Sequence, residues 1–335
     1  IGDRRGGGYR SKNRFHRNRA PGRAPLFIPP GVNRVEPRGP EPKPGLHPRN
    51  AHRHGYDFPA LTAAVPDLGK HLRPSPTGTP TIDFADPVAV LALNRALLAL
   101  HYGITTWSIP AGYLCPPVPG RADYIHAVAD LLAAEHGGVV PRGPTVRGLD
   151  IGVGANAIYP IIGRATYGWS FTGTETDRAA LASARRIVAA NPVLQGGVEL
   201  KEQKRPGCIF EGVTTPGERF AFCLCNPPFH RSAAEALATT RRKNRNLHGR
   251  ASDGRNFGGG AAELWCAGGE AGFIGRMIRE SAGRPSLCGW FTTLVSRADS
   301  LADLRQLLRR HANREVRVID LAQGQKKSRI LAWRF

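Results

Sequence analysis

The residue types best suited to chemistry stand at positions 226–229, directly after the apolar run 219–225. They are Asn226, Pro227, Pro228 and Phe229. An amine on a planar substrate can donate one hydrogen bond to the Asn226 side chain and one to the Pro227 carbonyl, while its ring stacks on Phe229. Proline has no N–H to compete for these acceptors, and its ring stiffens the corner of the chain. The stretch therefore predicts a site that holds an NH2 group on a flat ring.

Transfer of a methyl group to such an amine is the reaction that this arrangement favours. The lone pair of an exocyclic amine on adenine is delocalised into the ring, so the nitrogen is a weak nucleophile. Two acceptors that draw its hydrogens toward tetrahedral geometry localise the lone pair and aim it at an electrophile. Water can take the released proton afterwards. We therefore interpret residues 226–229 as the active site of an amino-group methyltransferase that uses S-adenosylmethionine.

A glycine-rich turn after another apolar strand offers a place for the cofactor. Gly152 and Gly154 follow the run that ends near Asp150, and glycines there let the backbone approach a nucleotide. Asn156 belongs to the same turn, and Asp150 could orient it. Glu175 ends the next predicted strand, 21 positions beyond Gly154, where a carboxylate can accept hydrogen bonds from both ribose hydroxyls. The turn alone describes a dinucleotide-binding dehydrogenase equally well, and the strand end at 226–229 favours the methyltransferase.

Strands and helices alternate from about residue 145 onward, which is the pattern of an α/β sheet. The predicted strands are 145–151, 168–174, 197–202, 219–225, 286–295, 314–321 and 328–335. The predicted helices are 177–190, 231–240, 263–281 and 299–312. The last two strands lie too close for a helical crossover and should pair antiparallel. Seven mostly parallel strands with a final antiparallel hairpin are typical of the class I, Rossmann-like methyltransferase fold, which we predict for residues 144–335.

Two further segments precede this predicted catalytic domain. Residues 1–46 are rich in Gly, Pro and Arg with few aliphatic residues, which predicts a basic, disordered tail. Residues 47–143 show helical spacing and predict a helical N-terminal subdomain, with one helix beginning after Asp86 and another over 123–136. A proline-rich loop, residues 115–121, is expected before the second helix.

The charge of the chain indicates a polyanionic partner. The 47 Lys and Arg residues outnumber 26 Asp and Glu residues, and the net charge of +21 favours nucleic acid. Residues 1–55 hold 13 basic and 3 acidic side chains, and residues 231–255 hold 7 and 2. The basic residues beside the predicted active site or between the last two strands are expected to contact RNA phosphates. They are Arg241, Arg242, Lys243, Arg245, Lys326 and Lys327.

Other features argue against several classes of protein. The six cysteines include no Cys-X-X-Cys pair, so neither a disulfide framework nor a zinc site is expected. His47, His52 and His54 lie among arginines, where RNA contact or loop structure is favoured over metal binding. The start of the chain lacks the apolar segment of a signal peptide, and no apolar run approaches ~18 residues. We expect a cytoplasmic protein that acts as a monomer without a metal ion.

Several longer strings resemble the ribosomal RNA large-subunit methyltransferase F family, the bacterial relative of the human methyltransferase-like sixteen protein. They are PGLHPRN at 44–50, PPVPGRADYIH at 116–126, LDIGVGAN at 149–156, IYP at 158–160, NPPFH at 226–230, ELWC at 263–266 and AQGQK at 322–326. The resemblance covers about residues 43–335. It has no counterpart for residues 1–42, and Ala267 stands where an acidic residue is expected.

This resemblance implies N(6)-methylation of one adenine in 23S ribosomal RNA, with S-adenosylmethionine as the donor. It further implies that Gly152, Gly154 and Glu175 hold the cofactor and that Arg121 meets the methionine carboxylate. Residues 226–229 would hold the adenine. The substrate would be the 23S RNA itself or an intermediate of large-subunit assembly.

Two alternatives stay open from the sequence. The first is a protein glutamine methyltransferase, because the side-chain amide of a glutamine substrate also presents an NH2 group to an Asn-Pro-Pro-aromatic corner. That family usually has Tyr at the last position, and its substrate does not require an enzyme with a charge of +21. A noncatalytic RNA-binding assembly factor could retain the same fold. The two intact motifs, the glycine-rich turn and residues 226–229, argue against it.

Overall fold

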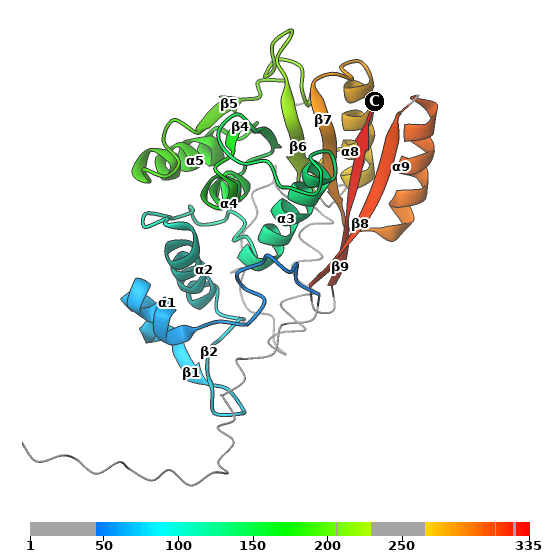
Figure 1. The fold of residues 1–335 in the computed structure, drawn as a ribbon. Helices are drawn as coiled ribbons and strands as arrows, with labels where there is room; N and C mark the ends of the chain where they lie inside the picture. Colours follow the sequence, from blue (N-terminus) through cyan, green and yellow to red (C-terminus); the bar gives the residue numbers. More distant parts are fainter. Residues whose placement is uncertain (1–44, 206, 229–264, 312, 324–325) are drawn as a thin grey trace, which may run out of the picture. The chain divides into compact units, whose positions relative to one another are not determined.

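The structure is a computed structural model that describes residues 45–205, 207–228, 265–311, 313–323 and 326–335. These ranges belong to one compact unit, Pro40–Phe335 (Figure 1). The tail predicted for residues 1–46 lies outside the described residues except for its last two positions. The helix predicted for 231–240 also lies outside them.

Helical segments and one short hairpin make up the part of the chain before the large sheet. They are α1 (Phe58–Ala64), the 3-10 helix η1 (Pro66–His71), β1 (Leu72–Pro74), β2 (Pro80–Ile82), α2 (Pro87–Tyr102) and α3 (Val118–Ala134). Helix α2 begins where the Asp86 carboxylate accepts a hydrogen bond from the Val88 N–H at 2.9 Å, and it ends at Gly103, whose φ is 67°. Strands β1 and β2 pair antiparallel, and the helical spacing of the sequence does not predict them.

Helix α3 begins earlier than the sequence indicates. The prediction placed a loop at residues 115–121 and the helix at 123–136, but α3 starts at Val118 with Pro119 in its first turn. Proline is tolerated there because the first N–H groups of a helix have no partner within the helix. Arg121 consequently lies on α3 and not in a loop.

The large sheet has seven strands in the order β5-β4-β3-β6-β7-β9-β8. The strands are β3 (Arg147–Ile151), β4 (Ser170–Glu175), β5 (Val198–Glu202), β6 (Phe220–Cys225), β7 (Cys288–Val295), β8 (Glu315–Gln323) and β9 (Lys326–Arg334). The helices among them are α4 (Ile158–Tyr167), α5 (Arg178–Ala190), α8 (Gly269–Ala282) and α9 (Ala298–Arg310). The first five strands in this order run parallel, and β8 and β9 form an antiparallel hairpin. The predicted class I methyltransferase fold is confirmed.

Helices cover both faces of this sheet (Figure 1). Side chains alternate along β6, so Phe222 and Leu224 join the core built with α2, α3 and α4, whereas Cys223 and Cys225 join the core built with α8 and α9. In the register of the sheet, Ile151 lies opposite both Thr174 and Cys225. The carboxyl ends of β3, β4 and β6 therefore meet at one edge.

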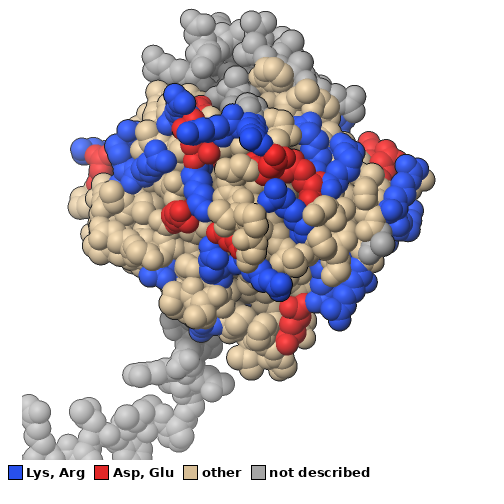
Figure 2. Space-filling view, turned by 90° about the horizontal axis from the view of Figure 1, so that it is seen from above, with Lys and Arg blue, Asp and Glu red and all other residues tan. Residues whose placement is uncertain are grey.

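Charged side chains of both signs lie on the face of this unit that Figure 2 shows. Figure 2 shows basic groups beside acidic ones over one face, and the described residues include ion pairs such as Arg178–Glu202 at 2.8 Å and Arg147–Glu218 at 2.9 Å. None of the helices in the described ranges is long and apolar enough to cross a membrane.

Candidate active site and cofactor cleft

A cleft that is partly open to solvent lies at the edge where β3, β4 and β6 end. Seven of the ten residues predicted to hold the cofactor or the amine line it together, namely Arg121, Gly152, Gly154, Asn156, Glu175, Asn226 and Pro228. Asp150 and Pro227 are buried and do not line the cleft. Phe229 lies outside the described residues. The cleft occupies the place where open α/β sheets bind ligands.

The glycine-rich turn has the backbone that its sequence predicts. Gly152 and Gly154 have φ angles of 74° and 64°, in the left-handed region where other residues are strained. The Gly152 and Val153 N–H groups both donate to the Thr174 carbonyl at 2.9 Å. The turn is thereby fixed against the end of β4, and its backbone forms part of the cleft wall.

Glu175 holds this turn from the neighbouring strand. Its Oε2 accepts a hydrogen bond from the Gly154 N–H at 3.0 Å, and its Oε1 accepts from the Thr176 and Asp177 N–H groups at 2.7 and 3.0 Å. A carboxylate offers about four lone-pair sites, so Oε2 can still accept from a ligand. The sequence predicted a ligand contact for Glu175, and the structure adds a supporting role for the turn and for the start of α5.

Asn156 is tied to the protein on both sides of its amide. Its Oδ1 accepts from the Ile158 N–H at 3.1 Å, and its Nδ2 donates to the Leu114 carbonyl at 3.3 Å. The backbone carbonyl of Asn156 also accepts from the Trp107 indole N–H at 3.0 Å. These contacts join the turn, the start of α4 and the loop before α3.

Two buried side chains at this edge have oxygen atoms without a partner. Both carboxylate oxygens of Asp150 and the Oδ1 of Asn226 accept no hydrogen bond from the described residues, although all three atoms are buried. Burial raises the pKa of the Asp150 carboxyl well above its ordinary value, the Glu175 carboxylate adds to this shift, and Arg121 opposes it. Unpaired buried acceptors cost free energy. Such atoms are typical of a site that a ligand completes.

Helix α3 supports the cleft through two residues. The Arg121 guanidinium donates to the Tyr159 hydroxyl at 2.9 Å and lies 5.7 Å from the centre of that ring. The fully buried Tyr124 hydroxyl accepts a hydrogen bond from the Cys225 N–H at 3.3 Å and pairs with the Thr292 hydroxyl at 2.9 Å. Cys225 directly precedes Asn226, so Tyr124 fixes the strand end that carries the predicted amine acceptor. Sequence reasoning missed Tyr124 and Tyr159, although both lie within the strings that carry the family resemblance.

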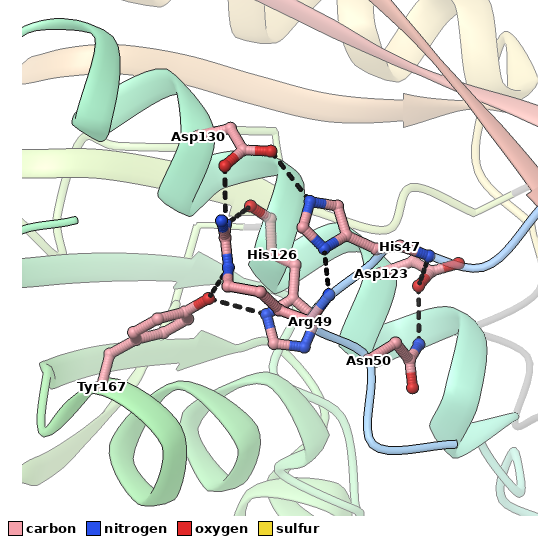
Figure 3. A network of polar contacts seen from close by, with 7 residues as sticks. All are labelled: His47, Arg49, Asn50, Asp123, His126, Asp130 and Tyr167. Atoms are coloured by element: carbon pink, nitrogen blue, oxygen red, sulfur yellow. Dashed lines mark hydrogen bonds and ion pairs between the residues drawn. The ribbon is translucent and has the colours of Figure 1, made fainter. Parts of the chain in front are cut away.

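A network of polar contacts joins the segment 47–50, here called the arm, to α3 and α4 (Figure 3). Arg49 lies at its centre and donates to the Tyr167 hydroxyl at 3.0 Å, to the His126 carbonyl at 3.0 Å and to Asp130 at 2.7 Å. His47 pairs with the other Asp130 oxygen at 2.8 Å.

Asn50 connects the arm to α3 in the same way, through hydrogen bonds of its side chain. Asn50 donates to the Pro119 carbonyl at 2.8 Å and to Asp123 at 2.6 Å, and its side-chain oxygen accepts from the His52 N–H at 2.9 Å. His47 and His52 therefore take part in the hydrogen bonds that hold this loop. Nowhere in the part of the chain that the structure describes do three or more His, Cys, Asp or Glu side chains gather as they would around a metal ion.

The predicted RNA contacts are not placed by the structure. Arg241, Arg242, Lys243 and Arg245 lie outside the described residues. Lys326 and Lys327 belong to β9, but their side chains are not described.

Comparison with known proteins gives a consistent result. An RNA methyltransferase family matches residues 41–335. A protein of Cronobacter sakazakii named ribosomal RNA large subunit methyltransferase F is 56% identical over 293 residues, which cover 88% of this chain and 94% of that protein. A protein of Yersinia enterocolitica with the same name is 54% identical over 299 residues and covers 88% of this chain and 89% of its own length.

Solved structures of a human protein have a similar fold. The catalytic domain of human METTL16 in complex with MAT2A 3′UTR hairpin 1 aligns with a TM-score of 0.73 at 31% identity, over 87% of this chain and 96% of that one. The N-terminal domain of human METTL16 in complex with SAH aligns with a TM-score of 0.67 at 28% identity, over 87% and 98% of the two chains.

Proposed function

The chain belongs to the ribosomal RNA large subunit methyltransferase F family of RNA methyltransferases, and we propose that its cleft methylates the exocyclic N6 of one adenine in 23S ribosomal RNA. The protein is an S-adenosylmethionine-dependent enzyme that acts on ribosomal RNA. We propose adenine as the target base, N6 as the methylated atom and residues 226–229 as the residues that hold the base. The observation that carries it is the buried Oδ1 of Asn226 in the wall of the cleft, which accepts no hydrogen bond from the residues that the structure describes.

The residues of the cleft fit the cofactor in charge and in hydrogen-bonding capacity. Asp150 is buried next to Ile151, which lines the cleft, and its two carboxylate oxygens accept no hydrogen bond from the described residues, so an ammonium group would satisfy them. Arg121 offers a guanidinium to a carboxylate, and Glu175 offers Oε2 to ribose hydroxyls. S-adenosylmethionine would supply a methyl group on a sulfonium, which is a strong electrophile. We assign the methionine end to Asp150 and Arg121, and the ribose to Glu175.

Asn226 and its neighbours would activate the adenine. The Asn226 Oδ1 and the Pro227 carbonyl each accept one N–H of the amine, which localises the nitrogen lone pair and aims it out of the ring plane. Tyr124 keeps this corner in place through the Cys225 N–H. Phe229 would stack on the base, which must first leave its own stack at a cost of a few kcal/mol.

Phosphate contacts would come from the basic residues that follow residues 226–229 in the sequence, from the two lysines at the start of β9 and from the tail. We propose this role for Arg241, Arg242, Lys243, Arg245, Lys326 and Lys327. For a single strand, the logarithm of the affinity falls with the logarithm of the salt concentration, and each neutralised phosphate makes that slope steeper by about 0.7. Deleting residues 1–42 should therefore lower RNA affinity and flatten that slope. An identical slope would remove the tail from RNA binding.

We also expect the enzyme to act as a monomer.

Mapping of modified adenines in ribosomal RNA tests the proposed target. Cells with and without this protein should differ at one N6-methyladenosine in 23S RNA, and the missing mark should return with the wild-type chain but not with Asn226→Ala. Methylation of another atom, or of a glutamine in a release factor, would reject the proposal. Unaltered 23S RNA in cells that lack the protein would reject it as well.

A further inference from the structure

A glutamate on the helix α8 holds three consecutive backbone amides of the segment before β6. The Ile209 N–H donates to both carboxylate oxygens of Glu280 at 2.8 and 3.0 Å, and the Phe210 and Glu211 N–H groups donate to Oε2 at 2.9 and 3.5 Å. Successive N–H groups that converge in this way form a concave site for an anion, which the side chain of Glu280 fills. The contact joins two segments about 70 positions apart in the sequence.

The segment that Glu280 holds is also a wall of the cofactor cleft. Cys208 and Ile209 line the cleft, whereas the side chain of Phe210 is fully buried and packs edge-to-face on Phe291 at 5.7 Å. Phe273 of α8 lines the cleft directly. It lies seven positions before Glu280 and therefore on the same face of the helix. One face of α8 thus contributes to the cleft in two ways: Phe273 lines it directly, and Glu280 holds the backbone of Ile209, which lines it.

The position of this wall along the sheet indicates which part of the cofactor it meets, given the proposed function. Asn226 ends β6 and would mark the reacting end, and Glu175 ends β4 and would hold the ribose. The Gln203 N–H, just beyond β5, donates to the Glu175 carbonyl at 2.8 Å. The order of the strands is β5-β4-β3-β6, so the base attached to the ribose extends toward β5. Cys208 and Ile209 line the cleft on the chain that leaves β5.

We propose that Glu280 is a positioning residue for S-adenosylmethionine, because its carboxylate fixes the backbone of Cys208–Phe210 as the wall against which the adenine of the cofactor packs. Glu280 itself does not touch the cofactor. Loss of this side chain leaves three amides without their acceptor and lets the wall shift. The effect falls on cofactor affinity and not on the chemical step, which depends on the strand end at β6.

Calorimetry on the full-length chain tests this assignment with the variants Glu280→Ala and Glu280→Gln. We expect the Kd for S-adenosylmethionine to rise about tenfold in Glu280→Ala and less in Glu280→Gln, whose amide oxygen can still accept. The Kd for free adenosine should rise by the same factor. The kcat at saturating cofactor and the KM for RNA should stay within about twofold of wild type. Thermal melting confirms that each variant is folded.

Glu270 provides a matched control on the same helix. Its carboxylate also holds two consecutive amides, those of Ser296 and Arg297 at 2.7 and 3.2 Å, but neither these residues nor Glu270 line the cleft. Glu270→Gln should lower the melting temperature without changing the Kd for the cofactor. An unchanged Kd in both Glu280 variants, or an equal loss of affinity in Glu270→Gln, would overturn the proposal. The Kd values for S-adenosylmethionine and adenosine do not depend on the target base, so either proposal can fail without the other.

Discussion

Helix α3 separates two polar regions that differ in how their hydrogen-bonding groups are satisfied. On the side of the arm, the carboxylates of Asp123 and Asp130 accept hydrogen bonds from His47, Arg49 and Asn50. On the side of the cleft, Arg121 lies near buried acceptors of Asp150 and Asn226 that have no donor in the described residues. Both regions are rich in polar residues and lie in strings of the same family resemblance. The two regions differ in whether their acceptors have hydrogen-bond donors, not in which residue types they contain.

The difference indicates separate uses for similar residues. A network in which every member has a partner contributes stability and fixes one arrangement of the backbone. A buried acceptor without a partner lowers stability until a ligand supplies the donor. The arm network should therefore be a structural element, and the cleft should be the functional one. Matched substitutions on the two sides can break or sharpen this contrast.

The largest effect is expected for a matched pair of asparagines. Asn226→Ala should lower methylation of RNA by about 10²–10³-fold, because it removes one positioned acceptor of the amine, and it should leave the Kd for S-adenosylmethionine within a few-fold. Asn50→Ala removes an amide that is already saturated by Pro119, Asp123 and His52. It should lower the melting temperature and leave kcat nearly unchanged. Single-turnover methylation and thermal melting measure both variants.

Results of the opposite kind would contradict this contrast. Near-normal turnover in Asn226→Ala removes the amide from the mechanism. A loss of kcat in folded Asn50→Ala as large as that in Asn226→Ala would place the arm network in the catalytic site.

Much of the fold could be predicted from local sequence, because its strands are short apolar runs bounded by turn residues. The predicted strands 219–225 and 197–202 differ by one residue from β6 and β5. The start of α3 was misplaced, since prolines at 116, 117 and 119 read as a loop although a first helical turn tolerates proline. That one boundary decides whether Arg121 stands on a helix.

The two polar regions could not be distinguished from the sequence. The arm contacts residues of α3 and α4 that are 69 to 118 positions away in the sequence, and no local pattern reports such pairs. The unpaired state of Asp150 depends on its burial between β4 and β6, which is a property of the assembled sheet. The motif at 226–229 was informative because its chemistry is local, whereas the support from Tyr124 comes from a different helix.

A smaller effect is expected for a pair of aspartates. Asp150→Asn should weaken S-adenosylmethionine binding by about tenfold, since the ammonium group loses its counter-charge. Burial raises the pKa of Asp150, so stability of the cofactor-free protein is lost as pH rises from the unfolded value of about 3.9 toward the raised folded value. Asp150→Asn removes this loss and should melt at the same or a higher temperature at pH 7 in the absence of cofactor. Calorimetry and melting curves measure the two quantities.

The corresponding substitution at Asp130 should lower stability and leave cofactor binding unchanged, the opposite of what is expected for Asp150. Burial alone would raise the pKa of its carboxyl, but hydrogen bonds from His47 and Arg49 outweigh it and lower that pKa. The stability that Asp130 contributes is present above the unfolded pKa and is lost as pH falls through the folded one. Asp130→Asn should therefore cost about 1 kcal/mol at pH 7, a small value because the side chain is half exposed, and should leave cofactor affinity unchanged. Equal responses of the two variants would remove the distinction between the regions.

The smallest effect is expected from His126, which should make the arm network sensitive to mild acid. Burial lowers the pKa of His126 to about 4, and the nearby His47 and Arg49 add to the shift. The unfolded chain binds the same proton near pH 6.5, so stability is full above pH 6.5 and is lost as pH falls toward 4. The loss should reach about 1 kcal/mol by pH 5.5. His126→Gln removes the titrating ring and should flatten this part of the melting temperature–pH curve, while the Kd for S-adenosylmethionine keeps its wild-type pH dependence. A wild-type curve that is flat between pH 6.5 and 5.5 would show that the network tolerates protonation of this ring, and His126 would then have no part in the pH dependence of stability.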